Sequence, residues 1–263
     1  GKSVLPDDLP YVTGSIGMLG TKPSWELMNN CDTLLMIGSG FPYAEYLPEP
    51  GQARGIQIDL DGSMLSLRYP MEVNLMGDSV ATLQELLPLV DYKEDRRWSS
   101  EIADSVAAWW QVVEKRALQQ ADPINPQLVI QRLSSKLPDY SIITADSGTA
   151  AFWYARNLRI RKGMLASLSG NLATMCPAVP YAIAAKFAYP DRMAVAISGD
   201  GAMQMLGMNE LITIAKYWKT WTDPRLLVIV LNNRELNMVT WEQRMLSGEP
   251  KFEASQDIPD LNY

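Results

Sequence analysis

The chain has 263 residues, 47% of them hydrophobic, and carries a formal net charge of −7. This length and composition predict a folded protein of about two domains and exclude extensive disorder. The acidic balance argues against a nucleic-acid-binding protein, because such a protein needs a basic surface to meet phosphate groups.

Histidine is absent from the sequence, and the two cysteines, Cys31 and Cys176, lie far apart. The absence of histidine excludes a Ser-His-Asp triad or a histidine-ligated metal within these residues. Neither cysteine belongs to a CxxC pair, which argues against a zinc site and favours a reducing, cytoplasmic location. No apolar run approaches the roughly 20 residues that a transmembrane segment requires.

The first segment, residues 1–90, alternates short apolar strands with helical stretches, which predicts a parallel sheet. Strands are expected at 33–37 and 55–59, and residues 79–90 have the apolar spacing of a helix. Asp78 or Ser79 is expected to cap that helix. Residues 91–122 are interpreted as a charged linker followed by a tryptophan-rich helix that joins two domains.

Residues 123–263 are expected to form the second domain, again with strands and helices in alternation. Its helices are predicted at 126–136, 180–187 and 206–218. Its strands are predicted at 141–145, 193–198 and 226–231, with a Gly/Ser loop at 167–171 and a surface loop at 217–224. The fold class predicted for the whole chain is therefore α/β, with two doubly wound parallel-sheet domains.

Two polar turns follow strands of this second domain. Gly199-Asp200-Gly201 follows the strand at 193–198, and Asn232-Asn233 follows the strand at 226–231. Residues 202–231 separate the turns, which suits a strand–helix–strand crossover. Either turn alone would be read as a loop, but together they place oxygen-bearing side chains at neighbouring strand ends.

These oxygens suit a hard divalent cation held against a diphosphate. Asp200 offers a carboxylate, Asn233 an amide oxygen and Glu235 a main-chain carbonyl, and Mg²⁺ takes such ligands in octahedral geometry. Gly199 and Gly201 would let the backbone approach the phosphates closely. Gly148 and Thr149, in the turn after the strand at 141–145, could donate to the other end of the diphosphate.

At these residues the chain resembles the thiamine diphosphate-dependent superfamily of pyruvate oxidase, acetolactate synthase and pyruvate decarboxylase. In the second domain the resemblance covers 145–156 (ADSGTAAFWYAR), 169–175 (SGNLATM), 179–186 (VPYAIAAK) and 231–243 (LNNRELNMVTWEQ). In the first domain it covers 13–24 (TGSIGMLGTKPS), 38–43 (GSGFPY) and 56–61 (IQIDLD), which look most like the FAD-bearing central domain of pyruvate oxidases.

The resemblance implies roles for individual residues of the second domain. Asp200 and Asn233 would be Mg²⁺ ligands, together with the carbonyl oxygen of Glu235. The thiamine diphosphate would be bound by Gly148, Thr149, Met175, Gly199, Gly201 and Ala202. Met175 matches the apolar residue that wedges between the two rings of the cofactor, although core packing is its alternative role.

The first domain is expected to bind FAD. The positions implied by the resemblance are Gly14, Gly17, Gly20, Thr21, Gly38, Ser39, Phe41 and Asp59. Asp59 follows Gly38 by 21 residues, a separation that suits a carboxylate on a ribose hydroxyl. Flavin binding alone would not identify an oxidase, because relatives such as acetolactate synthase can also hold FAD.

The resemblance also implies that an N-terminal pyrimidine-binding domain is absent and that the sequence is a fragment truncated at both ends. The glutamate that activates the cofactor belongs to that domain, so no catalytic residue is assigned within these residues. The isolated fragment is expected to be inactive, and the family's interfacial site implies a homodimer or homotetramer. Cys176, Ala178 and Asn237 stand where many relatives have glycine.

The leading functional hypothesis is oxidative decarboxylation of a 2-keto acid, similar to the reaction of pyruvate oxidase, with thiamine diphosphate, Mg²⁺ and FAD. One alternative is carboligation of the acetolactate synthase type. The other is a non-catalytic relative that kept the nucleotide-binding fold. The sequence does not determine the substrate or the electron acceptor.

Overall fold

A computed structural model describes residues 2–170 and 172–263 and divides the chain into two compact units. One unit comprises residues 13–109, and the other comprises residues 2–12 together with residues 110–263. The division falls inside helix α3 (Arg97–Ala117), within the segment predicted to link the domains. Residues 2–12, which the sequence grouped with the first domain, cluster with the second.

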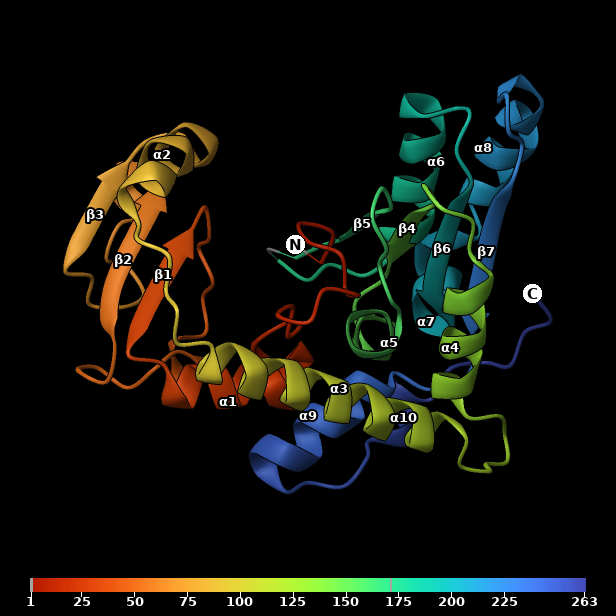
Figure 1. Cartoon of the computed structure of the whole chain (residues 1–263). Helices are drawn as coiled ribbons and strands as arrows, with labels where there is room; N and C mark the ends of the chain where they lie inside the picture. The colour runs from red at the N-terminus through yellow and green to blue at the C-terminus, as the bar shows by residue number, and fades with distance from the viewer. Residues whose placement is uncertain (1, 171) are drawn as a thin grey trace. The chain divides into compact units, whose positions relative to one another are not determined.

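The unit of residues 13–109 contains a parallel sheet with the strand order β1-β2-β3 (Figure 1). Its strands are β1 (Thr33–Ile37), β2 (Arg54–Asp59) and β3 (Val73–Met76). Burial alternates along β1, with Leu34 and Met36 buried in an apolar cluster that includes Met28. This one-sided pattern follows from the period of two along a strand, which sends successive side chains to opposite faces.

Helices of this unit begin at capping residues that the sequence makes recognisable. The helices are α1 (Lys22–Asn30), α2 (Ser79–Leu86) and the start of α3, with 3₁₀ turns at Gly17–Leu19, Ala44–Tyr46, Gly62–Met64 and Leu87–Leu89. The Asp78 carboxylate accepts hydrogen bonds from the N–H groups of Val80 and Ala81, both at 3.0 Å, which confirms the predicted cap.

The second unit contains a parallel sheet with the strand order β5-β4-β6-β7. Its strands are β4 (Ile142–Ala145), β5 (Leu165–Leu168), β6 (Ala194–Gly199) and β7 (Leu226–Leu231). Every residue of β4 is buried, as is β6 up to Ser198, which is typical of central strands covered on both faces.

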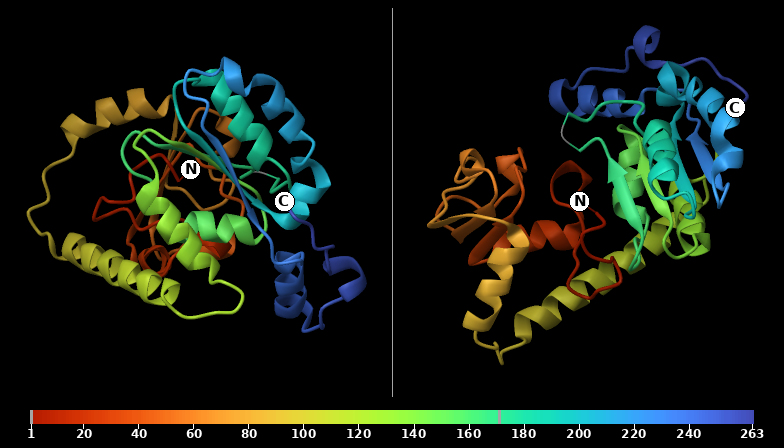
Figure 2. Two further views of the ribbon diagram at one scale, coloured as in Figure 1. Left: turned by 90° about the vertical axis from the view of Figure 1, so that its right-hand side faces the viewer. Right: turned by 90° about the horizontal axis from the view of Figure 1, so that it is seen from above.

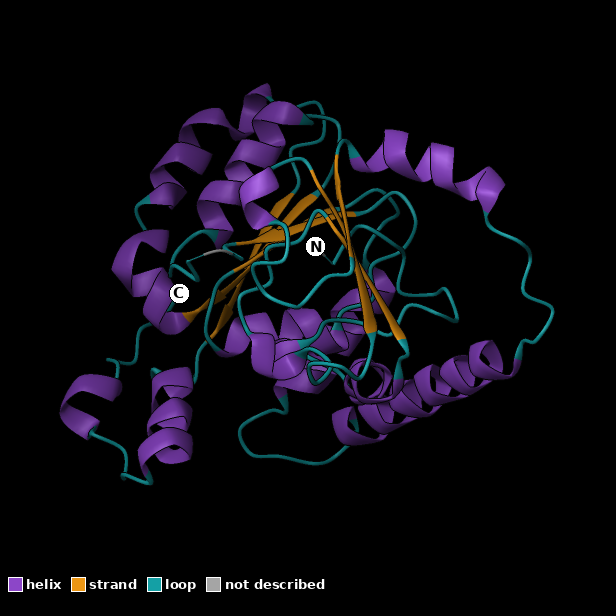
Figure 3. Ribbon diagram, turned by 90° about the vertical axis from the view of Figure 1, so that its left-hand side faces the viewer, coloured by secondary structure: helices purple, strands orange, loops and turns teal. Residues whose placement is uncertain are grey.

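Helices cover both faces of this sheet, with α6 and α8 on one side and α4 and α5 on the other (Figure 2). Figure 3 distinguishes these helices from the strands by colour. The helices are α4 (Pro126–Lys136), α5 (Thr149–Asn157), α6 (Ala178–Ala188), α7 (Asp200–Ala202), α8 (Glu210–Tyr217), α9 (Asn237–Ser247) and α10 (Glu253–Gln256). A π-helical turn, Met203–Gly207, and a 3₁₀ turn, Trp218–Thr220, complete them.

The prediction of two parallel-sheet α/β domains is confirmed. One local prediction was wrong. Ser167 and Leu168 belong to strand β5 rather than to a loop, because this segment pairs with β4. Residues 217–224, predicted as a surface loop, are mostly exposed, and only Trp221 of this segment is buried, next to the fully buried Lys186.

Lys186 explains how that segment is held. Its ammonium group donates to the main-chain oxygens of Pro190, Arg192 and Asp223, the last at 2.6 Å. These hydrogen bonds compensate for the burial of the charge. In the described part of the chain, no helix is both long and apolar enough to cross a membrane.

Candidate cofactor-binding site

The polar turns predicted to form a site lie at one edge of the four-stranded sheet. Asp146 follows β4, Asp200 follows β6, and Asn233 follows β7 after one intervening residue. The strands β4, β6 and β7 are parallel neighbours. Their carboxyl ends therefore bring these turns together, as expected for a ligand site of an open α/β sheet.

Asp200 joins two of the turns directly. It is 2% exposed, and one carboxylate oxygen accepts a hydrogen bond from the Gly201 N–H at 2.9 Å. The other accepts from the Arg234 N–H at 2.5 Å, across the gap between the loops. Arg234 has a φ of 57°, in the left-handed region that few non-glycine residues adopt. The Asp200 carboxylate thus fixes a strained turn next to Asn233.

Two further oxygen-bearing groups, the Asn233 amide and the Glu235 carbonyl, lie near this carboxylate. The Asn233 side-chain amide directs one of its two polar atoms toward the carbonyl and the carboxylate. That atom lies 2.9 Å from the Glu235 carbonyl oxygen and 3.2 Å from Asp200 Oδ1. Oxygens at such distances repel unless the amide is turned, so that its NH₂ group donates to both, or a cation lies between them. Neighbouring ligands on an Mg²⁺ octahedron lie about 3 Å apart, since each is about 2.1 Å from the ion. The observed spacing therefore fits either arrangement.

The donor set is chemically consistent with Mg²⁺. Within residues 2–170 and 172–263, no group of three or more acidic or thiol side chains could hold a metal. A cation at this edge would rely on one carboxylate supported by neutral oxygens. Such a site leaves coordination positions for phosphate and water, which is how Mg²⁺ is commonly held in phosphate-binding proteins.

A cavity of about 340 Å³ opens at this edge of the sheet. All nine residues predicted for the second-domain site line it, namely Gly148, Thr149, Met175, Gly199, Asp200, Gly201, Ala202, Asn233 and Glu235. Further lining residues were not predicted, namely Ser147, Ala150, Ala173, Leu231, Leu236, Asn237, Met238, Val239 and Glu242. Most of these belong to or flank α5 and α9, two helices that the sequence analysis did not assign. Asn171, in the motif at 169–175, lies outside the described residues.

Two glycines leave backbone exposed to the cavity. A Cβ atom added to Gly199 would meet nothing within 4 Å, and one added to Gly148 would meet only Met238, at 3.9 Å. Gly148 has a φ of 79°, which favours glycine at this position. Gly201 differs, because an added Cβ would lie 2.7 Å from a Leu236 methyl carbon and 3.4 Å from the Met175 methyl carbon.

Asp146 connects the turn after β4 to the end of β6 and the start of α6, a role not predicted from the sequence. It is 1% exposed, and its carboxylate accepts a hydrogen bond from the Ser198 hydroxyl at 2.5 Å and from the Ala178 N–H at 3.4 Å. Burial raises the pKa of Asp146 above its ordinary value, although these hydrogen bonds oppose the shift. The residue ties the ends of β4 and β6 to the start of α6.

The unusual residues Cys176 and Ala178 are buried, and neither lines the cavity. Cys176 has a φ of 77°, which explains why glycine suits this position. Its thiol lies 3.3 Å from the Ala202 carbonyl oxygen, and burial raises the pKa of that thiol. Asn237, the third departure, does line the cavity.

The Glu235 carboxylate belongs to a polar network with Asn237, Thr240 and Lys251. Burial alone would raise its pKa, but hydrogen bonds from Thr240 and Asn237 and the charge of Lys251 hold the pKa below its ordinary value. Thr240 Oγ1 lies 2.6 Å from Glu235 Oε1. Glu235 therefore offers the cavity its main-chain carbonyl while its carboxylate anchors the loop.

In the unit of residues 13–109, the residues predicted for FAD fall into two groups. Gly38 and Ser39 follow β1, next to Asp59 at the end of β2, because Ile37 pairs with Ile58. Gly14, Gly17, Gly20 and Thr21 precede α1 and pack closely, and Phe41, which follows β1, contacts this group through its ring. Thr21 caps α1 by accepting from the Ser24 N–H at 3.3 Å, and an added Cβ on Gly14 would lie 2.7 Å from the Thr21 methyl carbon.

Phe41 and Gly20 are also in contact with protein atoms. A Cβ on Gly17 would lie 3.1 Å from the Phe41 ring, and one on Gly20 would lie 2.6 Å from the Gly17 carbonyl oxygen. The close packing gives a structural reason for these glycines that does not require a ligand. Among the residues predicted for FAD, Gly38, Ser39 and Asp59 lie at the carboxyl ends of parallel strands, where open α/β sheets commonly bind ligands.

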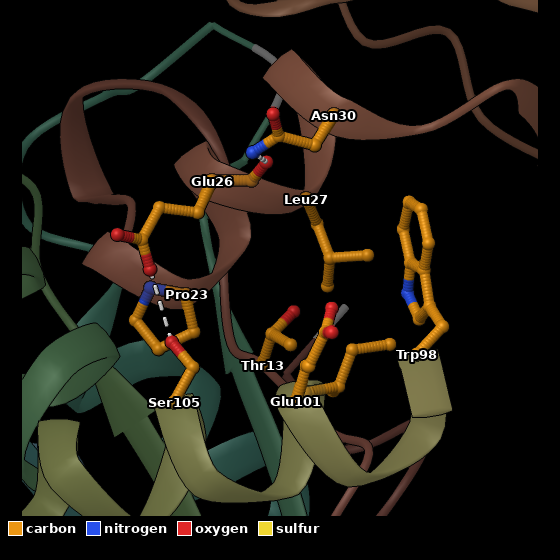
Figure 4. A pocket seen from close by; sticks show the side chains of 9 residues that line it. Thr13, Pro23, Glu26, Leu27, Asn30, Trp98, Glu101 and Ser105 are labelled. Atoms are coloured by element: carbon orange, nitrogen blue, oxygen red, sulfur yellow. Dashed lines mark hydrogen bonds between the residues drawn. The ribbon is translucent and has the colours of Figure 1, made fainter. Parts of the chain in front are cut away.

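The unit of residues 13–109 contains a cavity of about 230 Å³, which lies between α1 and the first half of α3 (Figure 4). Its lining combines apolar Leu27 and Trp98 with Glu26, whose carboxylate accepts a hydrogen bond from the Ser105 hydroxyl at 3.0 Å. None of the residues predicted for FAD lines this cavity.

Two protein-family models match the chain, one in each half. Residues 146–263 match the thiamine pyrophosphate enzyme, C-terminal TPP binding domain, and residues 1–86 match the thiamine pyrophosphate enzyme, central domain. Thiamine pyrophosphate is the same compound as thiamine diphosphate. The first match begins at Asp146 and includes the whole oxygen cluster.

Individual relatives point the same way. A putative thiamine pyrophosphate-containing protein of Bacillus subtilis is 38% identical over 93% of this chain and 41% of the relative. The acetolactate synthase isozyme 3 large subunit of Escherichia coli is 29% identical over 99% of this chain and 46% of the relative. The pyruvate oxidase of Lactiplantibacillus plantarum is 27% identical over 82% and 36%, respectively.

The chain thus spans less than half the length of these relatives. Both family models name thiamine pyrophosphate, as does the Bacillus subtilis relative. The chain belongs to the thiamine pyrophosphate-dependent enzymes and carries their central domain and their C-terminal TPP binding domain.

Proposed function

We propose that the cavity at the end of the four-stranded sheet binds thiamine diphosphate through Mg²⁺. The observation that carries this proposal is the position of the Asn233 amide, 2.9 Å from the Glu235 carbonyl oxygen and 3.2 Å from the Asp200 carboxylate. A single negative charge with two neutral oxygens suits an ion that must also coordinate a diphosphate. The open backbone at Gly199 and Gly148 provides the close approach that the phosphates need.

The chain's own residues would bind and orient the cofactor. Bound thiamine diphosphate supplies a nucleophilic carbon that adds to a keto group and stabilises the charge left by decarboxylation. Gly148 and Thr149, at the start of α5, would direct N–H groups to the diphosphate, since helix N-termini favour anions. Met175 would support the rings from the apolar side of the cavity. The activating carboxylate is expected in a separate pyrimidine-binding domain, outside these residues.

The proposed substrate is a 2-keto acid, and the proposed reaction is the oxidative decarboxylation of pyruvate with FAD. The relatives include both a pyruvate oxidase and acetolactate synthases, at similar identities. Carboligation of the acetolactate synthase type is therefore the alternative. The FAD proposal rests on the sheet edge that holds Gly38 and Asp59, where the buried Asp59 carboxylate could accept from a ribose hydroxyl.

Anaerobic mixing of the full-length protein with pyruvate, Mg²⁺ and thiamine diphosphate tests this assignment. Bleaching of a bound flavin, with release of CO₂, supports the oxidase. Acetolactate formation without bleaching supports carboligation and contradicts the oxidase. Flavin binding with neither reaction and no thiamine diphosphate binding would contradict both, and would favour a non-catalytic relative.

A further inference from the structure

Residues 252–260 (FEASQDIPD), here called the strap, lie against both turns that carry the proposed metal ligands. The strap contacts the turn after β7 through its backbone and the turn after β6 through Pro259 and Ile258. It does not line the cavity. Its contacts are therefore with the ligand-bearing loops rather than with the space that a cofactor would occupy.

The backbone hydrogen bonds of the strap determine the direction of the Glu235 carbonyl. Leu236 N–H donates to the Gln256 carbonyl at 2.7 Å, and Ile258 N–H donates to the Arg234 carbonyl at 3.0 Å. These bonds flank Glu235, which forms an antiparallel bridge with Asp257. Successive carbonyls of an extended segment point to opposite sides. The Glu235 carbonyl is thereby directed away from the strap and toward the Asn233 amide, 2.9 Å away.

A buried side chain keeps the strap in this register. Gln256 is 2% exposed, and its Oε1 accepts a hydrogen bond from the Phe252 N–H at 3.2 Å and lies 2.8 Å from the Thr240 hydroxyl. Its amide nitrogen donates to Gln243 Oε1 at 2.5 Å. Thr240 and Gln243 belong to α9, which lines the cavity through Val239 and Glu242. Gln256 therefore fastens the strap to the helix that follows the metal-binding turn.

The other end of the strap meets the Asp200 turn. Gln204, two residues after Ala202, donates to the Pro259 carbonyl at 2.7 Å. The Ile258 side chain lies against Gly201, since a Cβ added there would come 3.0 Å from its terminal methyl. One short segment thus holds the positions of the Asp200 and Asn233 turns relative to each other.

We propose that the strap positions the metal ligands, so that Mg²⁺ affinity depends on Gln256 and Gln204 although neither touches the cofactor. The inference rests on the proposed function, because it concerns the same cation site. Removing the Gln256 side chain frees the Glu235 carbonyl to rotate, and part of the binding free energy is then spent on ordering the loop. We expect a rise of about tenfold in the Mg²⁺ concentration needed for half-saturation, as for other residues that orient metal ligands.

The test uses the full-length protein and follows thiamine diphosphate binding by calorimetry at increasing Mg²⁺, for wild type, Gln256→Ala and Gln204→Ala. Hydrogen exchange of the Leu236 and Ile258 amides is measured in parallel without cofactor. The expected result is a higher Mg²⁺ requirement and faster exchange in both variants, with saturation restored at high Mg²⁺. Ser255→Ala is the matched control, because Ser255 is an exposed strap residue whose hydroxyl donates to the Phe252 carbonyl at 3.4 Å, within the strap itself.

The outcomes separate this inference from the proposed function. Absence of Mg²⁺-dependent binding in wild type would overturn the proposed function itself, and the strap's role with it. A different set of results would overturn the strap's role alone. In that case wild type binds thiamine diphosphate normally and Asp200→Asn loses binding, but Gln204→Ala and Gln256→Ala need no more Mg²⁺ than wild type. Gln204→Ala changes an exposed polar contact, so it decides the question even if Gln256→Ala does not fold.

Discussion

Replacing Gly199 by alanine should affect the stability of the fold and the affinity for the cofactor in opposite directions. Gly199 ends strand β6 with φ −75° and ψ 158°, an extended conformation that alanine adopts readily. A Cβ at this position would meet nothing within 4 Å. The free energy of unfolding of the cofactor-free protein should therefore stay unchanged or rise by about 0.4–1 kcal/mol, because alanine restricts the unfolded chain.

Cofactor binding should respond in the opposite direction. The new methyl group would occupy the space where the diphosphate approaches the backbone, and inserting a methyl into a filled site costs about 1–3 kcal/mol. This corresponds to roughly 5- to 150-fold weaker binding of thiamine diphosphate in the presence of Mg²⁺.

Urea unfolding and calorimetry, performed on the same preparations, measure the two effects. Gly248→Ala provides the converse control. Gly248 follows α9 with a φ of 71° and does not line the cavity. Alanine there should lower stability by about 1 kcal/mol and leave binding unchanged. Wild-type affinity in Gly199→Ala would refute the placement of the diphosphate against this turn.

Further predictions concern buried and titrating groups. Lys186→Met should lower the free energy of unfolding by about 3 kcal/mol in chemical denaturation, because three main-chain carbonyls lose their donor; a loss below about 1 kcal/mol would contradict this role. The hydrogen bond from Arg225 lowers the pKa of Asp223 to about 2, so its contribution exists above the ordinary value of 3.8 and is lost as pH falls toward 2. Asp223→Asn should therefore cost at most about 1 kcal/mol near neutral pH, since Arg225 is 60% exposed, and the difference should shrink below about pH 4. Burial raises the pKa of Asp146, so the folded state binds its proton more tightly and stability falls as pH rises above 3.8. Relative to wild type, Asp146→Asn should become more stable as pH rises, and parallel urea-unfolding curves across that range would argue against it.

Much of the site could be predicted because strand ends follow from local sequence. The apolar run Leu226–Leu231 is a strand with the bounds expected, and the residues after it fall at the sheet edge. Parallel pairing of β6 and β7 then brings Asp200 and Asn233 together. The strand bounds and the crossover spacing are therefore sufficient to predict that these side chains converge.

Other features depend on contacts that the local pattern does not reveal. The end of strand β5, Ser167 and Leu168, falls in the predicted loop 167–171 because Ser167 and the glycine after Ser169 resemble turn residues, and pairing with β4 overrides that tendency. The Asp146–Ser198 hydrogen bond joins residues 52 positions apart, so neither residue signals it alone. The strap was not predicted, because its role depends on the buried Gln256 meeting α9. Residues 2–12 join the second unit through the hydrogen bond from Lys2 to the Ala155 carbonyl and the two Asp7–Ile160 hydrogen bonds.

The most direct test of the central claim is a calorimetric titration of the full-length protein with thiamine diphosphate, with Mg²⁺ and then with a chelator. The oxygen cluster predicts binding only when Mg²⁺ is present, and a loss of at least about tenfold in Asp200→Asn, which keeps an oxygen but removes the charge. Equal affinity in the chelator, or in Asp200→Asn, would contradict the claim that Asp200, Asn233 and the Glu235 carbonyl hold the metal.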